Sequence, residues 1–123
     1  MAFIYSTNLA DVRARAQAQA RAAGLAEDRV VDFVIAVSEI AANTVRHARS
    51  TGSMEIWCES GEIVCEMHDE GVISDPLVGR QPPAADANGG YGLWLVQQVC
   101  DRVELESGEK GTTIRLYMSL PSA

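Results

Sequence analysis

Hydrophobic and polar residues recur at helical spacing over residues 30–48, VVDFVIAVSEIAANTVRHA. At about 100° per residue, one broad side of this predicted helix is apolar apart from a single threonine. That side holds Val30, Phe33, Val34, Val37, Ala41, Thr44, Val45 and Ala48. The opposite side carries Glu39, Asn43 and Arg46, with His47 at its edge, together with Ile35 and Ala36.

Glu39 and Asn43 are one helical turn apart, which places them about 6 Å from each other along the axis. They share their side with apolar residues, which indicates a covered surface whose polar groups need partners. A bound ligand could supply those partners. The alternative is that both are ordinary solvated surface residues.

The rest of the chain divides into short segments of helical or strand pattern. Residues 8–23 predict an amphipathic helix, with Asn8 as its N-cap and Gly24 just past its end. Alternation with period 2 predicts two hairpins. They join residues 54–59 to 62–68 and residues 102–108 to 111–118. The other expected elements are an edge strand over residues 2–6, a loop over residues 72–89 and a helix over residues 92–101.

This order of elements lacks strict alternation of strands and helices. It predicts an α+β fold, a two-layer sandwich in which helices cover one face of a mostly antiparallel sheet. A length of 123 residues predicts one domain, residues 1–123. The loop over residues 72–89 is long for a compact domain, which is typical of a lid or a disordered segment.

The amino-acid composition limits which binding partners and which cellular compartment we expect. A net charge of −7 disfavours nucleic acid, which is bound through Lys and Arg. The chain has no long apolar run and no signal-peptide pattern, so we expect no membrane span and a cytoplasmic location. The three cysteines, Cys58, Cys65 and Cys100, lack metal or disulfide spacing, so we expect small buried hydrophobic residues in a reduced compartment.

Four short motifs follow one another along the chain: Glu39 with Asn43, Asp69-x-Gly71, Gly90-x-Gly92-Leu93, and Gly111-Thr112-Thr113. Each is common when taken singly, and Asp-x-Gly often marks a turn. The sequence has neither a GxxxxGK[ST] loop nor a GxGxxG between a strand and a helix, so neither common nucleotide fingerprint applies.

In this order and spacing, the motifs resemble those of the GHKL ATPase superfamily, which includes gyrase-type ATPases and histidine-kinase catalytic domains. SEIAANTVRHA is similar to its N box, DEGVISDP to its adenine-site box, GGYGLWLVQQVCD to its second glycine box and GTTIRLYM to its closing strand. The subgroup that the chain resembles is the RsbW-type bacterial anti-sigma factor serine/threonine kinases. The resemblance covers essentially the whole chain and implies the GHKL ATP-binding fold, with ATP and magnesium as cofactors.

The resemblance also implies roles for individual residues. Asn43 would bind magnesium, Glu39 would be the catalytic base, and Asp69 would accept a hydrogen bond from the adenine amino group. Thr112 would support the adenine side through water, and Gly71 would let the backbone pass close to the base. The other residues that the resemblance places near the nucleotide are Gly90, Tyr91, Gly92 and Leu93 at the start of a helix, with His47, Arg46 and Arg80 as nearby cations.

The implied partners are a sigma factor and a STAS-type anti-sigma antagonist protein that would be phosphorylated on serine, and a homodimer stays open. One position departs from the family pattern, because Ile73 stands where the adenine-site box has a second glycine. A β-branched residue disfavours positive φ, so the lid would leave the site differently. Two alternatives therefore stay open: a nucleotide-sensing binding module with little kinase activity, and an α+β domain without a ligand.

Overall fold

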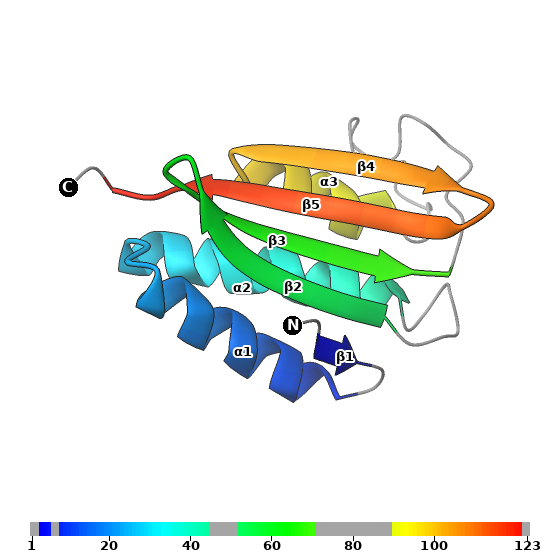
Figure 1. Ribbon diagram of the computed structural model, residues 1–123, viewed down its shortest axis with the longest axis horizontal. Helices are drawn as coiled ribbons and strands as arrows, with labels where there is room; N and C mark the ends of the chain where they lie inside the picture. The colour runs from blue at the N-terminus through cyan, green and yellow to red at the C-terminus, as the bar shows by residue number, and fades with distance from the viewer. Residues whose placement is uncertain (1–2, 6–7, 45–51, 71–89, 122–123) are drawn as a thin grey trace.

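Five antiparallel strands form one sheet in the order β1-β2-β3-β5-β4 (Figure 1). The structure is a computed structural model that describes residues 3–5, 8–44, 52–70 and 90–121. The strands are β1 (Phe3–Tyr5), β2 (Gly52–Glu59), β3 (Glu62–Asp69), β4 (Arg102–Gly108) and β5 (Gly111–Ser119). The helices among the described residues are α1 (Leu9–Ala22), α2 (Glu27–Asn43) and α3 (Gly90–Val99).

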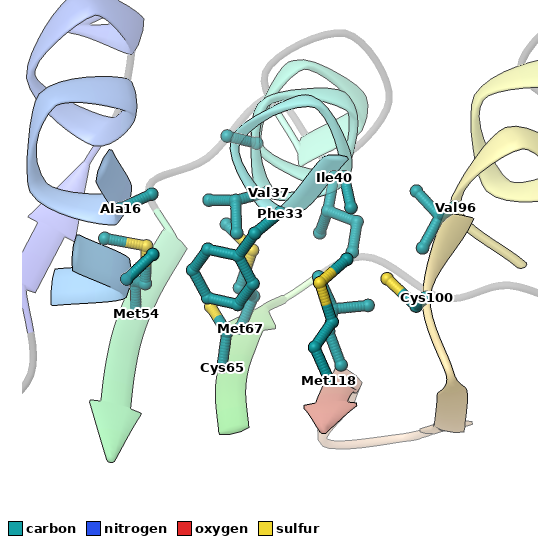
Figure 2. Close-up of a cluster of buried hydrophobic side chains, with 14 of the residues drawn as sticks. Ala16, Phe33, Val37, Ile40, Met54, Cys65, Met67, Val96, Cys100 and Met118 are labelled. Carbon is teal, nitrogen blue, oxygen red and sulfur yellow. The ribbon is translucent and has the colours of Figure 1, made fainter. Parts of the chain in front are cut away.

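The helices cover one face of the sheet, with α2 between α1 and α3 (Figure 2). Along β3, Ile63, Cys65 and Met67 occupy alternate positions and lie in the core beneath the helices. Phe33 and Val37 of α2 meet them from above (Figure 2). Burial of these apolar side chains holds the two layers together. The predicted α+β sandwich with helices on one face is therefore confirmed.

The first two helices meet at a turn that ends α1 in a defined way. Gly24 has φ +89°, a conformation that glycine adopts without steric cost. Its N–H donates to the Arg21 carbonyl, while the N–H of Leu25 donates to the Ala20 carbonyl, so the turn is a Schellman motif. The predicted end of this helix at Gly24 is confirmed. Asn8 occupies the N-cap position as expected, but its side chain makes no capping hydrogen bond.

Helix α2 begins at Glu27, three residues before the predicted start, and its C-cap is Thr44. The predicted continuation over residues 45–48 lies outside the described residues. Ala36, which the helical projection placed beside Glu39 and Asn43, is fully buried, and so is Ile40. Because α2 packs against the sheet and against both neighbouring helices, its buried surface is wider than one stripe.

Both predicted hairpins are confirmed. Ser60 and Gly61 both have positive φ, 50° and 77°, so the turn between β2 and β3 is of type I′, which matches the twist of paired strands. Cys65 and Cys100 are buried in the core, as expected. The expectation that Cys58 is buried is wrong: it is exposed, because it lies next to the last residue of β2 at the hairpin end.

Two further expectations concern the ends and loops. The short edge strand is confirmed as β1, and the predicted loop over residues 72–89 lies outside the described residues. No helix in the described part of the chain is long and apolar enough to cross a membrane.

The edge strand packs against the sheet at a glycine. Tyr5 pairs with Gly52 of β2, and its aromatic ring lies over the Gly52 Cα. A Cβ atom at position 52 would overlap the ring of Tyr5, with its Cε1 atom only 2.9 Å away. Gly52 therefore leaves the space through which this buried ring passes.

We expect Gly52→Ala to lower the free energy of unfolding by about 1–3 kcal/mol, the usual cost of overpacking a filled site. Denaturant unfolding followed by circular dichroism measures this. The matched control is Gly108→Ala, because a Cβ there meets nothing within 4 Å; we expect a change within about 0.5 kcal/mol. Equal effects of the two substitutions would contradict the packing of Tyr5 over Gly52.

Candidate functional site

A row of residues crosses the whole sheet at the end where α2 stops and α3 begins (Figure 1). Successive strand partners in this row are Tyr5, Gly52, Asp69, Thr112 and Ser107. Residues paired in this way project from the same face of an antiparallel sheet. Here it is the face under the helices, because Met67, two residues before Asp69, is buried in the core. Asp69, the last residue of β3, lies in the middle of the row.

The end of α2 contacts Asp69 directly. The hydroxyl of Thr44, the C-cap of the helix, donates to Asp69 Oδ2 at 3.0 Å. The same hydroxyl lies 3.1 Å from the Tyr5 hydroxyl, so edge strand, helix end and carboxylate form one chain of hydrogen bonds. Tyr5 and Thr44 are 1% and 2% exposed, whereas Asp69 is half-buried. The carboxylate is therefore held from the inside of the molecule and reaches toward its surface.

Glycine also shapes the other side of Asp69. Gly111 opens β5 with φ +104°, and a Cβ there would overlap the Asp69 carbonyl oxygen and lie 3.0 Å from the Glu70 Cα. The next residue, Thr112, is buried, and its hydroxyl lies 2.7 Å from that of Ser107 on β4. The Gly-Thr pair thus lets the backbone of β5 approach β3 and places a buried hydroxyl opposite Asp69.

Glu39 and Asn43 occupy the last two turns of α2, with Asn43 as its final residue. Both are half-buried, while Ile35, on the same side of the predicted helix, is exposed. Asn43 directly precedes the threonine that contacts Asp69, so its amide lies at the same end of the sheet. Asn43 has an interaction of its own, whereas Glu39 forms no hydrogen bond or ion pair with any residue that the structure describes.

The second glycine box forms the start of α3, as the sequence predicted, although the helix begins at Gly90 and not at residue 92. Leu93 is 7% exposed and packs in the hydrophobic core. Tyr91 and Gly92 lie in the first turn of the helix. The remaining candidates lie outside the described residues, namely Arg46, His47, Gly71, Ile73 and Arg80.

The described donor groups suit a magnesium–nucleotide complex better than a metal held by protein alone. No three His, Cys, Asp or Glu side chains in the described ranges are grouped to hold a metal ion. Magnesium bound with a nucleotide needs few protein ligands, because phosphate and water supply the others. The amide oxygen of Asn43 is a ligand of the kind that magnesium accepts. A carboxylate such as Asp69 suits an amino group of a base.

Sequence reasoning missed three residues of this site: Tyr5, Gly52 and Ser107. Their positions depend on the register between strands that are distant in the sequence, and no local pattern encodes it. Thr44 had a visible indication, since it was the single hydroxyl in an otherwise apolar helix side. A buried hydroxyl requires a partner, and its partners here are Asp69 and Tyr5.

Comparison with known families agrees with this geometry. Residues 6–118 match the family described as the histidine kinase-like ATPase domain, which is nearly the whole chain. The GHKL resemblance inferred from the motifs is thereby confirmed. Among curated proteins, no similar sequence was found.

Solved structures share the fold at low sequence identity. The RsbU and RsbW domains of Rv1364c from Mycobacterium tuberculosis superpose with a TM-score of 0.67 and 17% identity over 98% of this chain and 32% of that one. The histidine kinase domain of the blue-light activated histidine kinase from Erythrobacter litoralis gives 0.60 and 17%, over 91% and 61%. A second structure of that kinase gives 0.59 and 19%, over 85% and 39%. The chain therefore spans about a third to three fifths of these neighbours.

Burial of Tyr5 gives the site a measurable pH dependence. Burial raises the pKa of Tyr5 from 10.0 to about 12; the Thr44 hydrogen bond opposes this rise, and the Asp69 charge adds to it. Between about pH 10 and 12 the unfolded chain has lost the tyrosine proton and the folded protein has kept it. Stability from this group is therefore complete below pH 10 and falls as pH rises toward 12, by about 1.4 kcal/mol per pH unit.

We expect the free energy of unfolding of Tyr5→Phe to fall less steeply over this range than that of the parent protein. Denaturant unfolding at several values from pH 8 to 12 measures both slopes. Burial raises the pKa of the Cys65 and Cys100 thiols in both proteins, so comparing the two slopes removes most of their contribution. Parallel curves for parent and variant would show that Tyr5 is not the buried phenol described here.

Proposed function

We propose that this chain, which belongs to the histidine kinase-like ATPase domain family, is an ATP-dependent anti-sigma regulatory kinase of the RsbW type. Its family implies ATP binding. The observation that carries the proposal is the polar end of the sheet, where Asp69, the end of α2 and the start of α3 come together. The side chains and backbone groups there are of the types that bind the base, the metal and the phosphates of one nucleotide.

The base would bind at Asp69. A carboxylate only accepts hydrogen bonds, so it pairs with a donor such as the amino group of adenine. Thr112 lies directly across the sheet from Asp69 and would support the same base through its hydroxyl. Hydrogen bonds to a charged group are worth about 1.5–3 kcal/mol, so this contact would supply a large part of the selectivity for the base.

The phosphates would lie at the start of α3. The N–H groups of a first helical turn have no partners within the helix, and the helix dipole favours negative charge there. Glycine at positions 90 and 92 allows close approach of the backbone. This arrangement would explain how a protein of net charge −7 holds a polyanion.

The end of α2 would carry the chemistry. Asn43 would supply an oxygen ligand to magnesium, which neutralises phosphate charge when it is bound. Glu39, one turn earlier, would take the proton from the serine hydroxyl of a substrate protein as that oxygen bonds to the γ-phosphorus of ATP. The bond from this phosphorus to the oxygen of the β-phosphate would break, and ADP would leave. Phosphoryl transfer depends mainly on positioning and charge neutralisation, so one base and one metal ligand are a sufficient set.

The partners follow from the proposed subgroup. An RsbW-type regulator would bind a sigma factor and phosphorylate a STAS-type antagonist on serine. The choice rests on the motifs that resemble the RsbW-type subgroup, because a structure containing an RsbW domain and a histidine kinase domain both share the fold. A nucleotide-sensing module that binds ATP with little transfer is the rival, and the experiments below separate the two.

Asp69→Asn tests the site of the base. The substitution keeps the size of the side chain and removes its charge, so we expect ATP affinity to fall about ten- to a hundredfold. Isothermal titration with ATP and magnesium measures this, with circular dichroism as the check on folding. The control is Glu70→Gln, an exposed carboxyl at the next position, for which we expect the affinity of the parent. If the folded Asp69→Asn protein bound ATP with the affinity of the parent, Asp69 would not be the residue that binds adenine.

Glu39 and Asn43 should fail in different ways. Asn43→Ala should weaken ATP binding that depends on magnesium, because the metal loses a protein ligand. Glu39→Gln should bind ATP at least as well as the parent but transfer phosphate about 10²–10⁴ times more slowly, the usual contribution of a general base. Titration measures the binding, and transfer of radiolabel to a serine of the antagonist measures the rate.

Asp28→Asn is the matched control, since it changes an exposed carboxyl in the first turn of the same helix. If Glu39→Gln transferred phosphate at the rate of the parent, Glu39 would not be the base. A parent protein that binds ATP but transfers no phosphate would favour the nucleotide-sensing module.

A further inference from the structure

The chemistry of the groups around Thr44 decides which of them donates and which accepts in each hydrogen bond. Thr44 has one hydroxyl proton and two acceptors in reach: Asp69 Oδ2 at 3.0 Å and the Ile40 carbonyl oxygen at 3.3 Å. A charged acceptor forms the shorter and stronger bond. A carboxylate cannot donate, so a proton directed at Ile40 would leave two acceptor oxygens facing each other. Thr44 therefore donates to Asp69.

Once Thr44 donates to Asp69, it can only accept from Tyr5. The phenol of Tyr5, 3.1 Å away, is then the donor at the start of the chain. A hydroxyl that accepts one hydrogen bond becomes a better donor in the next, so the phenol strengthens the contact with the carboxylate. The raised pKa of Tyr5 keeps its proton in place across the physiological range.

The chain of hydrogen bonds also depends on where β1 lies. Tyr5 belongs to a three-residue edge strand, and its ring reaches Thr44 by passing over Gly52. Asp69 is the partner of Gly52 on the following strand. The edge strand is therefore connected to the carboxylate across β2, by a side chain that only a glycine at position 52 accommodates.

We propose that Tyr5 and Thr44 are positioning residues for Asp69, which fix the orientation of its carboxylate and so set the base selectivity of the nucleotide site. The inference rests on the proposed function, ATP binding at Asp69. A carboxylate held in one orientation favours a 6-amino purine, whose amino group donates, over a 6-oxo purine, which presents an acceptor. A carboxylate that loses its bond to Thr44 is held less firmly in that orientation, and we expect it to discriminate less between the two.

A purely structural role for the pair makes a different prediction. If Tyr5 and Thr44 only satisfy each other in the buried corner, their substitutions lower stability but leave the folded protein with its parent preference for ATP over inosine triphosphate. The ratio of the two affinities therefore separates positioning from packing, because loss of folded protein affects both ligands equally.

The experiment is titration of the full chain with ATP and with inosine triphosphate, each with magnesium. Tyr5→Phe keeps the ring over Gly52 and removes only the hydroxyl. We expect its ATP affinity to fall about two- to tenfold, the value of one neutral hydrogen bond, with a smaller loss for inosine triphosphate. Thr44→Val should lower the ratio at least as much, while Thr44→Ser, which keeps the hydroxyl, should restore it.

Matched controls come from the opposite face of the sheet. Tyr117→Phe and Thr113→Val remove the same groups from β5, at positions that alternate with its core residues, and both should leave the ratio unchanged. Loss of ATP affinity without a change in the ratio would overturn the inference. Parent affinities for both nucleotides in Tyr5→Phe and Thr44→Val would overturn it as well. A parent protein that binds neither nucleotide would overturn the proposed function and the inference with it.

Discussion

The hydrogen bond between Thr44 and Asp69 joins the last turn of α2 to the last residue of β3, and the site depends on this junction. The core between α2 and the sheet is made of apolar side chains, and apolar contacts allow small sliding movements. A bond to a charged oxygen has a defined length and direction, so it fixes where the helix ends relative to the strand. This bond also sets the positions of Glu39 and Asn43, because they lie in the last two turns of α2.

The distribution of charge limits how this site can hold phosphate. Four arginines in the described part of the chain are engaged in ion pairs, namely Arg21 with Glu27, Arg29 with Asp32 and Asp101, Arg102 with Glu62, and Arg115 with Glu66. Ion pairs near the surface contribute little to stability, but each neutralises the charge of its arginine. In the proposed function, the backbone N–H groups at the start of α3 would be the donors to the phosphates. Backbone donors also cost no reorganisation when charge develops on a transferred group.

Local patterns in the sequence predicted most of the fold, because helix and strand periodicity are local properties. The apolar stripe of α2, the Schellman end at Gly24 and both hairpins follow from residues that are close in the chain. The burial of Ala36 did not, since it results from packing on both neighbouring helices. The alignment of Tyr5 with Gly52 and Asp69 did not either, because it needs the register of three strands that are brought together only by folding. Motif spacing predicted Asp69 and Thr112 as candidate site residues, and the structure added the groups that contact them.

The two acidic residues of the candidate site differ in how firmly they are held, and their proposed tasks differ in the same way. Asp69 is fixed by Thr44 and by the close approach of Gly111, as suits a group that must present one constant orientation to a base. Glu39 is half-buried on the helix and has no bonded partner among the described residues. As the proposed base, it would act without disturbing a hydrogen bond in the described part of the fold. A site that both recognises a base and moves a proton gains from this separation, because rigidity serves the first task and would hinder the second.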